Sequence, residues 1–127
     1  MKLWVDDVRP APIGYKWVRS VNEAISEIES NERAIQRQYE YAQKCFDKRD
    51  YSNRTKHYML AKGLEIIFID IDHDAGEYTY DGGDYIKLLD WLEETGRSYP
   101  IRIHSMNPVG IINMRKIIER NGWKEVK

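Results

Sequence analysis

A run of apolar residues that ends in a cluster of charged ones constrains this sequence more than any other feature. Residues 66–69 are typical of a buried strand, and Asp70, Asp72, His73 and Asp74 follow within five positions. A fold has no need of several carboxylates at the end of an apolar strand. The cluster therefore indicates a site for chemistry at the point where this strand ends.

The composition indicates one folded domain over residues 1–127, with 42% hydrophobic and 32% charged residues. A formal net charge of -1 excludes a chain held to nucleic acid by charge alone, so duplex nucleic acid is not an expected partner. Cys45 is the only cysteine, and no apolar segment approaches the length of a membrane span. We therefore expect a cytoplasmic protein with no membrane partner.

Hydrophobic periodicity predicts an α/β fold with a mostly parallel sheet covered on both faces. The predicted strands are residues 2–5, 15–20, 65–71, 100–105 and a short last strand at 123–127. The predicted helices are residues 21–48, 52–62, 84–96 and 108–122, the last of them capped by Asn107. In the second helix, Tyr58 and Met59 are expected to point inward.

A helical hairpin rich in tyrosine and basic residues is inserted at about residues 31–63. This insertion holds eight Lys or Arg and four Asp or Glu, a net charge of about +4, whereas the rest of the chain carries about -5. One interpretation is a solvated helix pair that serves as a homodimer surface. The other is a cationic wall or lid for an anionic ligand, and the sequence leaves both open.

Polar and ionisable residues follow three of the predicted strands. Asp6 and Asp7 follow the first strand, residues 72–74 the third, and residues 104–107 the fourth. In an open parallel sheet, ligands bind beyond the carboxyl ends of the strands. We therefore expect these three segments to meet at one edge of the sheet.

Carboxylates placed close together repel one another unless a cation neutralises them. Oxygen-rich sites of this kind suit a divalent cation such as Mg²⁺ or Mn²⁺. The candidate ligands are Asp6, Asp7 and Asp72, with Asp74 close by. Asp70 is either a further member of the site or a buried, hydrogen-bonded acid.

Two histidines lie beside these carboxylates in the predicted sheet. His73 and His104 follow neighbouring strands, and imidazoles exchange protons near neutral pH. We expect them, together with Asp72, to be the catalytic residues, one histidine as general base and the other as general acid. The sequence does not assign the order.

Four residues are candidates for holding a phosphate. Ser105 and Asn107 lie at a predicted helix N-terminus, which attracts anions. Arg9 follows the first acidic pair, and Arg102 lies on the fourth strand. A cation site, two imidazoles and an anion-binding helix end together favour phosphate chemistry.

Three stretches carry a family resemblance: LWVDDVRPAP at 3–12, IDHDAG at 71–76 and IRIHSMNPVG at 101–110. Together they resemble the cyclic-phosphate processing receiver-like domains, a divergent branch of the response-regulator receiver fold. The resemblance implies a flavodoxin-like, doubly wound parallel sheet of five strands in the order 2-1-3-4-5. It also implies activity toward a cyclic phosphate, such as a cyclic nucleotide signal in phage or bacterial defence.

The resemblance also implies roles for single residues. Asp6 and Asp7 match the metal-binding acidic pair of receivers, Asp72 the phosphoacceptor position, and Ser105 the hydroxyl residue after the fourth strand. Receivers end their fifth strand in a lysine that pairs with the phosphoaspartate, and here only Lys124 offers a poor match. The loss of that lysine beside two added histidines favours hydrolysis over storage of an acyl phosphate.

The leading functional hypothesis is a metal-dependent phosphodiesterase that opens a cyclic phosphate, with the acidic cluster as its cation site. A non-catalytic sponge or sensor that binds a nucleotide is the first alternative. A receiver-type domain phosphorylated on Asp72 is the second.

Overall fold

The computed structural model describes residues 1–127, which form two compact units. The first unit comprises Met1–Ile25 and Ile66–Lys127, and the second comprises Ser26–Glu65. No helix combines the length and the hydropathy that a membrane span requires.

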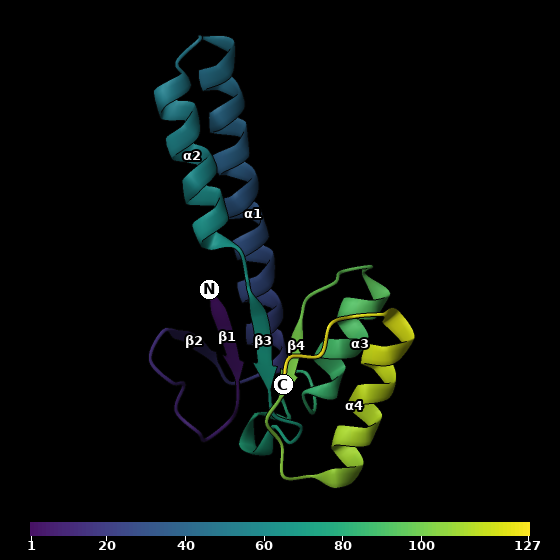
Figure 1. The fold of residues 1–127 in the computed structure, drawn as a ribbon. Coiled ribbons are helices and arrows are strands. Elements are labelled where there is room, and N and C mark those ends of the chain that lie inside the picture. Colours follow the sequence, from purple (N-terminus) through teal and green to yellow (C-terminus); the bar gives the residue numbers. More distant parts are fainter. The chain divides into compact units, whose positions relative to one another are not determined.

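The first unit is built on a parallel sheet of four strands, in the order β2-β1-β3-β4 (Figure 1). The strands are β1 (Lys2–Val5), β2 (Tyr15–Val18), β3 (Phe68–Ile71) and β4 (Ile101–Ile103). The predicted α/β class with a parallel sheet is therefore confirmed, and each strand lies inside its predicted range.

The predicted fifth strand is reduced to one parallel bridge between Ile101 and Glu125, so the five-stranded sheet does not form. Backbone hydrogen bonds flank this bridge, from Ile101 N to Lys124 O (2.9 Å) and from Val126 N to Ile101 O (2.7 Å). The Glu125 carboxylate accepts hydrogen bonds from Arg115 and from Lys127. The segment is therefore held by side chains as well as by its single bridge.

The two faces of the sheet differ in burial. Leu3, Ile69 and Ile101 lie side by side in register on one face, and all three are fully buried. On the opposite face, Trp4 is half-buried and Arg102 is exposed. The crossover between two parallel strands of a sheet is right-handed. Connections that run in the same direction across the sheet therefore place their helices on the same face.

This rule explains why only one face is covered. The connections from β2 to β3 and from β3 to β4 run in the same direction across the sheet, and both contain helices. The connection from β1 to β2 runs the other way and contains no helix. The predicted doubly wound arrangement therefore lacks helices on its second face.

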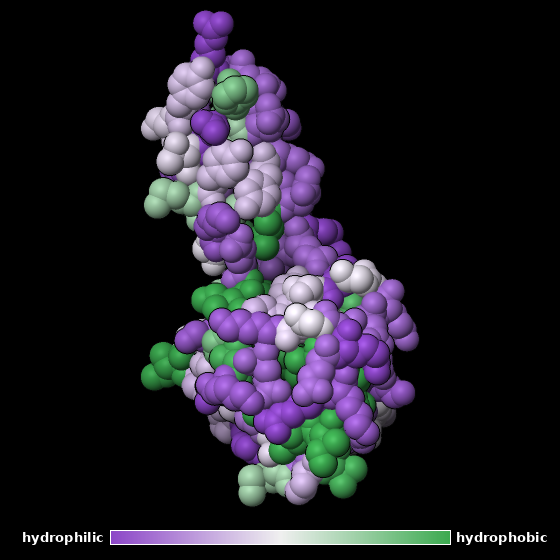
Figure 2. Space-filling view, turned by 45° about the vertical axis from the view of Figure 1, so that its right-hand side comes forward, coloured by the Kyte–Doolittle hydropathy of each residue, from purple (hydrophilic) through white to green (hydrophobic).

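Two helices complete the first unit and pack against each other, α3 (Ile86–Glu94) and α4 (Pro108–Asn121). As predicted, Asn107 caps α4, because its side-chain oxygen accepts a hydrogen bond from Gly110 N (3.0 Å). Among the exposed apolar side chains of this unit are Met106, Val109 and Ile112, around the start of α4. Separate hydrophobic areas are visible on this unit in Figure 2.

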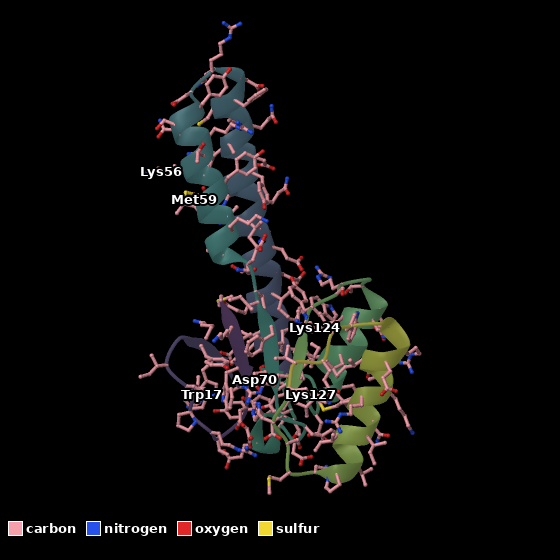
Figure 3. The ribbon with its side chains drawn as sticks, in the orientation of Figure 1. Trp17, Lys56, Met59, Asp70, Lys124 and Lys127 are labelled. Atoms are coloured by element: carbon pink, nitrogen blue, oxygen red, sulfur yellow. The ribbon has the colours of Figure 1, made fainter.

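The second unit is a helical hairpin, somewhat longer than the insertion predicted at 31–63. It contains most of α1 (Val21–Asp47), together with all of α2 (Tyr51–Leu64). Tyr39 and Tyr58 pack edge to face across the hairpin with ring centroids 5.6 Å apart. Met59, which was expected to point inward, is 71% exposed and lies on the outside of α2 (Figure 3). The weakly amphipathic α2 needs few inward residues, because one helix alone faces it within this unit.

The α3–α4 pair generates a prediction about pH. The Glu93 carboxylate accepts hydrogen bonds from Arg120 Nε and Nη2 (both 2.8 Å) and from Asn121, which lower its pKa below the ordinary value. A carboxyl group whose pKa falls on folding stabilises the fold above its unfolded pKa, and this contribution is lost as the pH falls through the folded pKa.

We therefore expect Glu93→Gln to lower the melting temperature at pH 7 and to leave it nearly unchanged at pH 2.5, measured by circular dichroism. The neighbouring, exposed Glu94 serves as the control, and Glu94→Gln should have little effect at either pH. An equal loss of melting temperature at both pH values for Glu93→Gln would contradict this role of the ionised carboxylate.

Candidate active site

The ends of three adjacent strands bring three ionisable side chains together. Asp6, Asp72 and His104 each directly follow a strand, and backbone hydrogen bonds from Asp72 N to Val5 O (2.9 Å) and from His104 N to Ile71 O (3.0 Å) extend the pairing to them. One ligand atom from each of the three side chains lies within 4.8 Å of the others. The sheet register thus builds the cluster expected at the carboxyl edge.

The imidazole of His104 lies between two buried carboxylates. Its Nδ1 is 2.6 Å from Asp70 Oδ1, and its Nε2 is 2.9 Å from Asp6 Oδ2. Trp4 stacks on the ring, with centroids 3.9 Å apart and planes 5° from parallel. Because both ring nitrogens face carboxylates, His104 can bind a cation only if Nε2 loses its proton and exchanges its contact with Asp6 for the metal.

Asp70, for which the sequence left two interpretations open and which Figure 3 labels on β3, is 1% exposed and hydrogen-bonded to His104. Arg102 pairs with Asp70 in the sheet register, and its Nη1 is 3.9 Å from Asp70 Oδ2. The candidate phosphate ligand Arg102 thus lies beside a buried carboxylate. Asp70 belongs to the cluster through His104, at a position deeper in the sheet than Asp6.

Arg9 lies across the acidic pair formed by Asp6 and Asp72. Its Nε is 3.6 Å from Asp6 Oδ2 and its Nη2 is 3.7 Å from Asp72 Oδ2, while nearly half of its side chain is exposed. Burial alone would raise the pKa of Asp6, but hydrogen bonds from the Arg9 backbone, His104 and the Val8 backbone outweigh it and lower the pKa. Asp6 is therefore held as a carboxylate.

Asp7 lies apart from the group formed by Asp6, Asp72 and His104. Its carboxylate faces Gly76, where an added Cβ would collide with it, and Gly76 has a φ of +54°. Burial raises the pKa of Asp7, and the charges of Asp6 and Asp72 raise it further. Repulsion among these three carboxylates makes the region attractive to a cation.

His73 belongs to a second group of side chains. Its Nδ1 is 2.9 Å from Asp74 Oδ1 and 3.4 Å from Asn107 Nδ2. Its ring packs against Gly110 of α4, because an added Cβ there would lie 2.5 Å from the imidazole. His73 Nε2 makes no hydrogen bond. His73 therefore has a ring nitrogen available to bind or exchange a proton with a ligand, whereas both ring nitrogens of His104 are occupied.

Ser105 and Asn107 shape the start of α4. Ser105 Oγ accepts a hydrogen bond from Asn107 N (3.1 Å), and Asn107 Oδ1 caps the helix. Both side chains are half-buried. They lie on the segment that follows β4, where Asn107 Nδ2 is 3.4 Å from His73 Nδ1. Their polar atoms therefore serve the local turn, and the helix N-terminus beyond them remains the candidate anion site.

The last segment supplies no lysine to Asp72. The bridge of Glu125 to Ile101 places Lys124 beside the start of β4, and Ile101 pairs with β3 three residues before Asp72. At about 3.3 Å per residue, Lys124, which precedes the bridge residue Glu125, lies roughly 13 Å along the sheet from Asp72. The receiver's pairing of a lysine with the phosphoacceptor is therefore not reproduced by Lys124.

Sequence reasoning missed Trp4 and undervalued Asp70. A signal for both exists, because Trp4 precedes Asp6 by two positions and Asp70 precedes Asp72 by two, so each pair projects to one face of its strand. The register then pairs Trp4 with Asp70 directly. Only the register, which a single sequence does not supply, shows that His104 lies against both.

The donor set of the cluster fits a divalent cation. Asp6 and Asp72 offer carboxylate oxygens, which suit Mg²⁺ or Mn²⁺, and His104 offers an imidazole nitrogen, a ligand more typical of transition metals. The hydrogen bond from His104 Nδ1 to Asp70 is the arrangement by which carboxylates orient metal-binding imidazoles. Asp7 and Asp74, also predicted as ligands, lie outside this group of three.

A family model described as the cyclic-phosphate processing receiver domain matches residues 1–48 and 49–120. No curated protein and no solved structure matches the chain significantly.

The buried contact between Asp70 and His104 predicts a loss of stability on its removal. We expect Asp70→Ala to lower the free energy of unfolding by about 2–4 kcal/mol, because the imidazole loses its buried partner. Asp70→Asn should cost less, since the amide oxygen still accepts a hydrogen bond from Nδ1. Urea unfolding followed by tryptophan fluorescence measures this, because all four tryptophans lie in the first unit.

Asp74, the exposed carboxylate beside the other histidine, provides the matched control. Asp74→Ala should change the free energy of unfolding by less than about 0.5 kcal/mol. Equal losses for Asp70→Ala and Asp74→Ala would show that the buried pair does not stabilise the fold.

Proposed function

Because the chain belongs to the family of cyclic-phosphate processing receiver domains, we propose that it is a divalent-cation-dependent phosphodiesterase that opens a cyclic phosphate, such as that of a cyclic nucleotide. The observation that carries this proposal is the contact of His104 with Asp6 and Asp70 beside Asp72. A buried cluster of this charge at the carboxyl edge of a parallel sheet is typical of a site for a cation and an anionic ligand.

Asp6, Asp72 and His104 would hold the cation, with Asp7 beside them as a further acidic group, whereas Asp74 contacts His73. The cation, when bound, supplies Lewis acidity that withdraws charge from the phosphoryl group. Asp70 positions His104 by accepting the hydrogen bond from its Nδ1. In this proposal His104 is a ligand through Nε2, which gives up its proton and its direct contact with Asp6 when the cation binds between them.

His73 is then the residue that transfers a proton. Its Nε2 is free, and Asp74 orients the ring by its contact with Nδ1. Ring opening adds water across one P–O ester bond: the water oxygen bonds to phosphorus, and its proton ends on the departing alkoxide oxygen. His73 takes the proton from water or delivers it to that oxygen, a role that suits an imidazole near neutral pH.

Three groups would bind the phosphate oxygens. Arg9, which lies across Asp6 and Asp72, has an exposed guanidinium that can donate to them. The N-terminus of α4, shaped by Ser105 and Asn107, offers backbone N–H groups and a favourable dipole. Arg102 would contribute positive charge from the neighbouring strand.

A panel of cyclic mononucleotides, cyclic dinucleotides, cyclic oligonucleotides and RNA with 2′,3′-cyclic ends tests the activity. We expect a linear phosphate product from one of these classes in the presence of Mn²⁺ or Mg²⁺, detected by liquid chromatography and mass spectrometry, and its loss in EDTA. Recovery of intact ligand after denaturation, with binding but without product, would instead identify a nucleotide sponge.

Variants of the three histidines test the division of roles. We expect His73→Ala to lower kcat by about 10²- to 10⁴-fold while Mn²⁺ binding is kept. His104→Ala should lose both turnover and Mn²⁺ binding, measured by calorimetry. His57→Ala, on the helical hairpin, is the control and should leave both unchanged. Loss of Mn²⁺ binding in His73→Ala but not in His104→Ala would reverse the assignment.

A further inference from the structure

A pocket of about 430 Å³ opens beside the acidic cluster, and Asp7 is the one lining residue that also enters the proposed chemistry. It lies in the first unit, between the loop after β1, the end of β2 and the short 3₁₀ helix Gly76–Tyr78. The lining residues are Asp7, Val8, Arg19, Gly76, Glu77 and Tyr78. Asp7 connects the pocket to the cluster, because this residue directly follows Asp6 in the chain.

Arg19 is the one cationic residue of this pocket, and its guanidinium forms no ion pair with a carboxylate. Its Cζ lies 4.0 Å from the centroid of the Trp17 ring, and its Nη1 donates a hydrogen bond to the Tyr78 hydroxyl (3.2 Å). Arg9 and Arg102, by contrast, each lie within 4 Å of a carboxylate. Arg19 is therefore held in place with most of its N–H donors unused.

The wall that carries Tyr78 is anchored before any ligand binds. The Asp81 carboxylate accepts hydrogen bonds from Ser20 Oγ (2.5 Å) and Asn22 Nδ2 (3.1 Å). Gly82, with a φ of +110°, lies so close to the first residue of α1 that an added Cβ would be 2.8 Å from Val21 Cβ. These contacts fasten the loop to the residues that follow Arg19, so the pocket has a fixed shape.

The charges of the pocket select among ligands. Glu77 is exposed and Asp7 half-buried, so two carboxylates face the same space as the Arg19 guanidinium. A simple anion would meet two negative charges there. A phosphate ester with a neighbouring hydroxyl matches the set better, because the phosphate accepts from Arg19 and the hydroxyl donates to a carboxylate.

We propose that this pocket is a second phosphate subsite for a 3′,5′-linked cyclic dinucleotide or cyclic oligonucleotide: Arg19 binds a phosphate other than the one placed beside the cation site, and Asp7 or Glu77 binds the free 2′-hydroxyl next to it. The assignment to a substrate rests on the proposed function, whereas the binding itself does not. Trp17, which Figure 3 labels on β2, and Tyr78 both contact the guanidinium and position it.

Calorimetric titration in EDTA tests the subsite without turnover. The probes are cyclic di-AMP and cyclic di-GMP, their 2′-deoxy forms, 3′,5′-cyclic AMP as a ligand with a single phosphate, and inorganic phosphate. We expect at least one cyclic dinucleotide to bind more tightly than its 2′-deoxy form, than 3′,5′-cyclic AMP and than inorganic phosphate. No binding of either cyclic dinucleotide at millimolar concentration would overturn the proposal.

Arg19→Gln should weaken binding of that cyclic dinucleotide by roughly 10- to 100-fold, the effect of losing a charged hydrogen bond. Tyr78→Phe keeps the ring and removes the hydroxyl, and should weaken binding by about 2- to 10-fold. Lys16→Gln removes one exposed positive charge from β2, the strand that ends just before Arg19, as a matched control and should have no effect. Unchanged binding by folded Arg19→Gln would overturn the proposal.

The subsite proposal and the phosphodiesterase proposal can each fail without the other. If the chain binds cyclic dinucleotides through Arg19 but never produces a linear product with Mn²⁺, the subsite stands and the phosphodiesterase proposal fails. If hydrolysis occurs and Arg19→Gln retains the wild-type KM, the phosphodiesterase stands and this subsite fails.

Discussion

The imidazole of His104, held between the buried carboxylates of Asp6 and Asp70, is the interaction on which the arrangement of the site depends. Burying two carboxylates is unfavourable unless a hydrogen-bonded partner compensates each of them. One ring serves both, because its two nitrogens point in opposite directions. Trp4 covers the ring, so the strand order of the sheet and the geometry of the site are fixed by the same contacts.

Charge is distributed around this centre in a graded way. Asp6 has a lowered pKa because hydrogen bonds outweigh its burial, whereas the pKa of Asp7 is raised by burial and by the neighbouring charges. Arg9 neutralises part of the cluster from the solvent side. The site thus combines a deep anionic part with a cationic rim, the arrangement needed to accept a cation and a phosphate together.

Local sequence patterns predicted much of the fold. The strand ends at Asp6, Asp72 and His104 follow from apolar runs that stop abruptly, and the α4 cap follows from Asn107 and Pro108. The predicted fifth strand does not form, because residues 123–127 are held by a single bridge and by side-chain contacts. No local sequence pattern distinguishes such a segment from a strand. The uncovered sheet face follows from the helix-free connection between β1 and β2. The roles of Trp4 and Asp70 depend on register, which pairs residues more than sixty positions apart.

The stack of Trp4 on His104 has an optical consequence. An indole in van der Waals contact with a charged imidazole loses part of its fluorescence, whereas a neutral ring quenches it less. A ligand that takes the place of the proton on His104 would therefore alter the emission of Trp4. The protein carries within β1 a chromophore that reports on the charge of its most buried cluster, without any added label.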